Sequence, residues 1–155
     1  MASTYEAMML ALTLNPKPYA RYALLGASTV ALTANGDTLM QFPSAIQTDP
    51  NVTPGGSGNT YFTLTPGTWW ISSSVRVSAN TSMIQYIATG NTPNESNSLA
   101  SGSCSNFVAV GASELVEFST ATQVCSMIWS NTAVNAVAYG SPTLGLTHIS
   151  FLKVS

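Results

Sequence analysis

Charged side chains are the scarcest feature of this 155-residue chain. Aspartate, glutamate, lysine and arginine together make up 6% of it, about a quarter of the share usual in soluble domains. The formal net charge is −2, and the four basic residues are scattered along the chain, at Lys17, Arg21, Arg76 and Lys153. Neutralising nucleic-acid phosphates requires clustered lysine and arginine, so we expect no nucleic-acid partner. No run approaches the roughly 20 apolar residues of a membrane span, so we expect no membrane partner either.

Histidine and cysteine are nearly absent. The one histidine, His148, lies in the middle of a predicted strand, where a packed or interface residue is more common than a catalytic one. Cys104 and Cys125 have no CxxC spacing, so the pair predicts no metal site. A disulfide between them stays open at this stage, with two free thiols favoured.

The acidic residues form no catalytic pair. Glu114 and Glu117 are three positions apart, so on a strand their side chains point to opposite faces, and a glycosidase needs two carboxylates facing one another. Asp37 belongs to an Asn-Gly-Asp turn, and the segment 49–51 is too short a signal for calcium. We therefore predict no enzymatic activity, no cofactor and no metal.

What the chain has instead is 45% hydrophobic residues among many serines and threonines. Turn residues recur at short intervals, and the runs between them are rich in Val, Ile, Thr, Tyr, Phe and Trp, which is typical of an all-β sandwich or barrel. The segment 90–106 is expected to be a long polar loop, and 53–59 a second loop. Strands are predicted over 21–32, 39–42, 60–65, 68–79, 82–88, 106–110, 114–119, 123–130, 135–139 and 146–154.

Two of these strands carry most of the information. In 68–79, residues alternate so that Trp69 shares the core face with Ile71, Val75 and Val77, whereas Trp70 lies on the opposite face. The last strand, 146–154, is apolar on both faces, as a central strand or an interface strand would be. Something must therefore cover the second face of the sheet that holds Trp70.

The chain is expected to form one β domain over residues 20–155, preceded by an N-terminal arm over residues 1–19. Ala, Met and Leu dominate Met1–Leu14, which predicts a short helix ending before Pro16. The arm carries Glu6 and no basic start, so it does not resemble a secretory leader.

The stretch 60-TYFTLTPGTWWISSSVRV-77 is preceded by 21-RYALLGASTVAL-32 and 41-QFPSAIQTD-49 and followed by 146-LTHISFLKVS-155. In this order the segments resemble the tumour-necrosis-factor and complement globular-head family, over roughly residues 21–155. The resemblance implies an antiparallel jelly-roll β-sandwich and a tight homotrimer. With so little charge, the chain looks most similar to phage and viral proteins of this fold, which serve as capsid decoration (cement) or fibre proteins.

An apolar, charge-poor chain must hide much of its apolar surface, and trimer formation would hide it. Aromatic residues are common at such interfaces, although exposed Trp70, Tyr86 or Trp129 would also suit stacking on a sugar ring. The candidates for the trimer interface are Trp70, Tyr86, Trp129, Tyr139, His148 and Leu152.

The expected function is therefore that of a non-enzymatic virion protein, a trimeric decoration protein that stabilises a phage head. It would bind the major capsid protein through the N-terminal arm and base loops, on the capsid surface of virions assembled in the host cytoplasm. One alternative is a receptor- or glycan-binding tip of a tail or head fibre, which would recognise a host surface glycan through loops such as 90–106. Another is a secreted cytokine-like or lectin ligand.

Overall fold

The computed structural model describes residues 19–92, 95–137 and 146–155, without the side chains of 106–108. Apart from one turn of 3-10 helix, η1 (Glu95–Asn97), all the regular structure described is β. The strands are β1 (Tyr19–Ala23), β2 (Thr29–Ala31), β3 (Gly36–Leu39), β4 (Ser44–Gln47), β5 (Val52–Gly55), β6 (Tyr61–Leu64), β7 (Gly67–Thr89), β8 (Ser98–Phe118), β9 (Thr122–Ser130), β10 (Asn135–Val137) and β11 (His148–Lys153).

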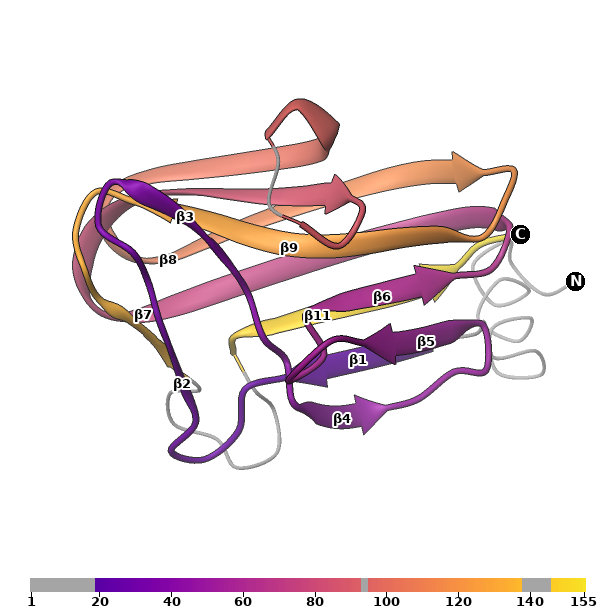
Figure 1. Ribbon diagram of the computed structural model, residues 1–155, viewed down its shortest axis with the longest axis horizontal. Coiled ribbons are helices and arrows are strands. Elements are labelled where there is room, and N and C mark those ends of the chain that lie inside the picture. The colour runs from indigo at the N-terminus through magenta and orange to yellow at the C-terminus, as the bar shows by residue number, and fades with distance from the viewer. Residues whose placement is uncertain (1–18, 93–94, 138–145) are drawn as a thin grey trace, which may run out of the picture.

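Two long strands connect the two layers of the sandwich. The register between β7 and β8 shifts between Arg76 and Thr81, and Figure 1 shows both strands turning back at the same end of the molecule. The front sheet is β4–β1–β11–β7–β8, using residues 67–77 of β7 and 109–118 of β8. The back sheet is β5–β6–β9–β7–β8, using residues 83–89 and 98–104, with β3 beside the far end of β9. The predicted antiparallel jelly roll is confirmed.

The core lies between the two sheets and follows the predicted alternation of β7. Trp69, Ile71, Val75 and Val77 are all buried, and the indole N–H of Trp69 donates a 2.9 Å hydrogen bond to the carbonyl oxygen of Thr65. Aromatic rings fill the space between the layers, with centroids 4.7 Å apart for Tyr22 and Phe62 and 5.0 Å apart for Phe62 and Phe151. The last strand, β11, pairs with β1 on one side and β7 on the other, so it is central, as its apolar faces predicted.

Several predicted strand boundaries were wrong. The strand expected over 21–32 is broken after β1, because Gly26 takes a positive φ of 60° before β2 begins. The segments 68–79 and 82–88 form one strand, β7, rather than two. The segment 53–59 is only partly a loop, since Val52–Gly55 pairs with β6 as β5.

The largest error concerns the polar loop expected over 90–106. Residues 98–104 pair with β7 as the first arm of β8. Their small polar side chains hide the period-2 signal, but small side chains are required here, because a Cβ on Gly102 would fall on the carbonyl oxygen of Gly111. The predicted helix over Met1–Leu14, most of the predicted arm and Tyr139 lie outside the described residues.

Candidate functional site

The outward side of the front sheet, called here the contact face, carries a row of four apolar side chains. Tyr19 of β1 stands opposite Leu152 of β11, Leu152 opposite Trp70 of β7, and Trp70 opposite Leu115 of β8. Tyr19, Trp70 and Leu115 are 37%, 45% and 51% exposed, and Leu152 is half-buried. The row therefore crosses four adjacent strands and ends at the free edge of the sheet.

A hollow of about 230 Å³ lies against this row. The row supplies three of its lining residues, Tyr19, Trp70 and Leu152. The others are Ser72, Ser150 and Phe151. An apolar side chain from another molecule would fit such a hollow and remove the surrounding rings from water.

The contact face becomes polar away from the row. The next position along the strands brings Ser150, Ser72 and Ser113 into register, and the one after it brings His148 opposite Ser74. The ring Nδ1 of His148 lies 3.2 Å from the carbonyl oxygen of Leu146. Exposed apolar surface is thus concentrated at one end of the contact face.

The predicted interface residues divide between two faces. Trp70, His148 and Leu152 lie on the contact face. Tyr86 and Trp129 lie on the outward side of the back sheet, alternating with buried Gln85 and Ile128. Tyr139 is outside the described residues. Sequence reasoning missed the other members of the row, Tyr19 and Leu115, which only cross-strand register brings together with Trp70.

A polar trio lies buried between the two sheets and was not predicted. The side-chain amide of Gln85 donates hydrogen bonds to Ser73 Oγ at 2.7 Å and to Ser126 Oγ at 3.1 Å, while Ser73 Oγ donates to the carbonyl oxygen of His148 at 3.0 Å. The side-chain amide oxygen of Gln85, Oε1, is buried without a hydrogen-bond partner in the described structure. Such a network ties the two layers together at this level.

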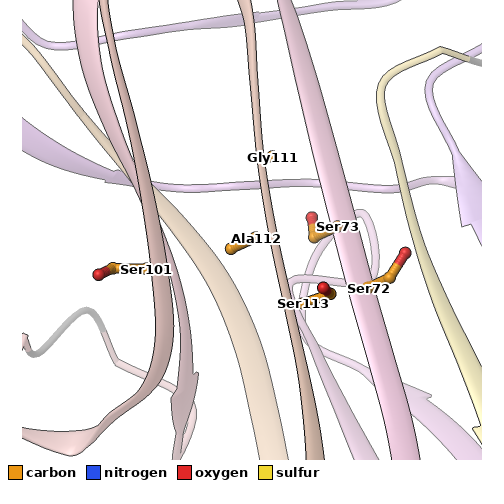
Figure 2. A pocket seen from close by; sticks show the side chains of 6 residues that line it. All are labelled: Ser72, Ser73, Ser101, Gly111, Ala112 and Ser113. Carbon is orange, nitrogen blue, oxygen red and sulfur yellow. The ribbon is translucent and has the colours of Figure 1, made fainter.

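A hydroxyl-lined pocket of about 450 Å³ lies beside β7 and both arms of β8. Figure 2 shows Ser101 on one strand segment, with its side chain pointing away from the segment that carries Gly111, Ala112 and Ser113, while Ser72 and Ser73 lie on the strand beyond. The lining offers hydroxyls, a methyl and backbone groups, which form hydrogen bonds but transfer no proton near neutral pH. The side chains that line this pocket therefore supply no group for acid–base catalysis.

The carboxylates are equally uninformative about catalysis. In the register of β8 and β7, Glu114 stands opposite inward-facing Ile71 and Glu117 opposite Thr68, so the two point to opposite faces, as predicted. Asp49 Oδ1 accepts hydrogen bonds from the backbone and side-chain nitrogens of Asn51 at 2.8 and 2.9 Å, which is turn chemistry. Among the described residues, no three His, Cys, Asp or Glu side chains group as metal ligands would.

The two cysteines are free thiols on opposite faces of the back sheet. Cys104 packs against the main core, whereas Cys125 belongs to a second cluster with Ala88 and Met127 on the outward side. Since the sheet separates them, they cannot be joined without moving the backbone. Burial raises the pKa of the Cys125 thiol to about 11.

None of the described helical structure is long and apolar enough to span a membrane. No protein-family model and no curated protein sequence matches the chain.

Solved structures do match. Murine APRIL at pH 8.0 matches with a TM-score of 0.61 and 12% identity, over 88% of this chain and 99% of that one. The Eiger TNF protein of S. frugiperda gives a TM-score of 0.63 and 8% identity, over 91% and 94%. The globular domain of zebrafish complement 1qA gives 0.52 and 14%, over 90% and 98%. At these identities a likeness reports fold and not activity. The chain therefore has the jelly-roll fold of the tumour-necrosis-factor and complement globular heads.

Proposed function

We propose that this chain is a non-enzymatic structural protein that works as a homotrimer assembled through the contact face. The observation that carries the proposal is the apolar row of Tyr19, Leu152, Trp70 and Leu115. Its side chains lie side by side on four strands, and no charged side chain interrupts them. A contiguous apolar strip of this kind is costly in water and marks a surface that another molecule covers.

A second copy of the chain is the partner that suits this strip best. A three-fold contact is heterologous, so the row of one copy must meet a different surface of the next copy. The adjoining edge of β8 offers such a surface, since no strand of the described chain other than β7 pairs with it. Its residues Ala109, Gly111, Ala112 and Ser113 are small, which lets a neighbouring chain approach closely. Trimeric association is also what the family resemblance implies.

Within this class, we assign the trimer to the decoration of a phage capsid. The assignment is supported by the low charge of the chain, by the similarity to charge-poor phage jelly rolls and by the lack of a catalytic set among the described residues. Binding would stabilise the shell through the area buried at capsomer junctions, with the N-terminal arm and base loops contacting the major capsid protein.

Sedimentation of the purified chain with decoration-free capsids of the phage that encodes it tests this function. We expect saturable binding, with a copy number that is a multiple of three and is fixed by the capsid lattice. Absence of binding to such capsids would exclude the decoration role while leaving the trimer itself untouched.

The second candidate is a receptor- or glycan-binding fibre tip. It is favoured by a separate observation, the pair of partly exposed aromatic side chains, Tyr86 and Trp129, on the outward side of the back sheet.

A further inference from the structure

The outward side of the back sheet carries a small aromatic platform. Trp129 of β9 stands between Asp37 of β3 and Ile84 of β7, and one step along, Tyr86 of β7 stands opposite Met127 of β9. Trp129 and Tyr86 are therefore diagonal neighbours on one face, close enough for both rings to contact one ligand. Both are half-buried.

Two carboxylates stand at the edge of the platform. The hydroxyl of Tyr86 hydrogen-bonds to Glu95 of η1, which places the carboxylate of Glu95 beside the ring. Asp37 is placed at this edge by its register opposite Trp129. Partial burial and then the charge of Glu95 raise its pKa, and the charge of Asp37 contributes to raising the pKa of Tyr86. On the other side of Tyr86 and Ile84, the edge arm of β8 places the exposed hydroxyls of Ser101 and Ser103.

The chemistry of these groups restricts what would bind. Strands β3 and β9, helix η1 and residues 83–89 of β7 contain no lysine, arginine or histidine, so two carboxylates would repel an anionic ligand. A flat ring suits an apolar C–H face, and carboxylates at the edge of the ring accept hydrogen bonds from adjacent hydroxyls. One common kind of ligand combines an apolar face with a rim of hydroxyls and carries no charge: a pyranose.

We propose that Trp129, Tyr86, Asp37 and Glu95 form a binding site for a neutral carbohydrate. The ring of Trp129 stacks on the sugar, its indole N–H donates to a sugar oxygen, and Asp37 and Glu95 accept from sugar hydroxyls. The site lies on the back sheet, away from the contact face of the front sheet, so trimer formation through the contact face leaves three copies of it open. The proposal therefore does not depend on the assembly role, and it deepens the second candidate function by naming the ligand class of the same aromatic pair.

Affinity electrophoresis in native gels tests the site with defined probes. The gels contain a neutral polysaccharide (dextran, mannan, xylan or hydroxyethylcellulose) or an acidic one (alginate or hyaluronate). We expect at least one neutral polysaccharide to retard the full-length protein and neither acidic one to do so. Trp129→Ala should weaken the retardation about tenfold, the loss expected for one aromatic stacking contact.

Matched variants separate a binding role from a folding role. Glu95→Gln should weaken retardation, whereas Glu117→Gln removes another exposed carboxylate, on the front sheet, and should leave retardation unchanged. Circular dichroism and sedimentation of the same samples establish that each variant is folded and assembled as the wild type is. Failure of every neutral polysaccharide, preference for an acidic one, or equal retardation of the wild type, Trp129→Ala and Glu95→Gln would overturn the proposal. Capture of spermidine in equilibrium dialysis, without carbohydrate binding, would also overturn it and assign the site to an organic cation.

Discussion

Replacing Trp70 by alanine should dissociate the proposed trimer while leaving each subunit folded. Trp70 projects from the contact face with 45% of its surface exposed, so the isolated subunit loses less packing when this ring is removed than when a fully buried ring is removed. Its neighbour in sequence, Trp69, is fully buried, and changing that residue would unfold the core instead. The two adjacent tryptophans thus separate the energetics of assembly from those of folding.

The exposed surface sets the size of the effect. A tryptophan side chain presents up to about 250 Å², so its 45% exposed share is about 110 Å². At about 25 cal/mol per Å², burying that area contributes about 3 kcal/mol per subunit and at most about 9 kcal/mol per trimer. Removing it raises the trimer dissociation constant by up to about 10⁶-fold, and therefore the concentration of half-dissociation by up to about 10³-fold.

Sedimentation velocity at protein concentrations from about 0.1 to about 50 µM measures this shift. Trp129→Ala is the matched control, because it removes the same ring from the back sheet and should leave the trimer intact. A Trp70→Ala protein that sediments as the wild type does, or a Trp129→Ala protein that falls apart instead, would refute the assignment of the contact face.

Three further predictions concern the fold. Gly102→Ala should lower the free energy of unfolding in urea by about 1–3 kcal/mol, because the new Cβ meets the carbonyl oxygen of Gly111. The control Ser101→Ala should change that free energy little, and equal stabilities of the two variants would contradict the close packing of the two arms of β8. At pH 8, a disulfide reagent should modify Cys104 in the native protein and Cys125 only after denaturation, and rapid native labelling of Cys125, located by mass spectrometry, would count against its burial. The pKa of Cys125 is raised from 9.0 to about 11, so the contribution of its buried neutral thiol to the free energy of unfolding is complete below pH 9 and is lost as the pH rises towards 11. The melting temperature of Cys125→Ala should therefore fall less over that pH range than that of the wild type, and an equal fall would contradict the prediction.

The sequence predicted those parts of the fold that depend on hydrophobic alternation. The burial of Trp69 and the position of Trp70 on the opposite face follow from side chains that alternate between the two faces of a strand. A central position was one of the two that the apolar faces of the last strand predicted, and its pairing with β1 and β7 confirms it. The jelly roll was predicted from the family resemblance that the segments around 60–77 carry. The first arm of β8 escaped prediction because small side chains alternate along it, Ala100, Gly102 and Cys104 with Ser101 and Ser103, and they give only a weak hydrophobic signal. Its pairing with β7 makes it a strand.

The candidate site was harder to predict, because a face is assembled by register and not by local pattern. Tyr19 fell within the predicted N-terminal arm, and Leu115 was one residue of a predicted strand. Both join Trp70 only through pairings between segments far apart in the chain. Tyr86 and Trp129 were grouped with Trp70 because they are aromatic. Both lie on the other sheet, Tyr86 on the part of β7 that pairs with β9 and Trp129 on β9 itself. The position of Glu95 beside Tyr86 depends on a loop conformation that has no sequence signature.

The mass of the native protein in solution tests the central claim most directly. One chain weighs 16.2 kDa, so sedimentation equilibrium at micromolar concentration should give three times that mass, about 49 kDa. A mass of one chain under the same conditions would contradict the account, because the row of Tyr19, Leu152, Trp70 and Leu115 would then remain in water with no partner.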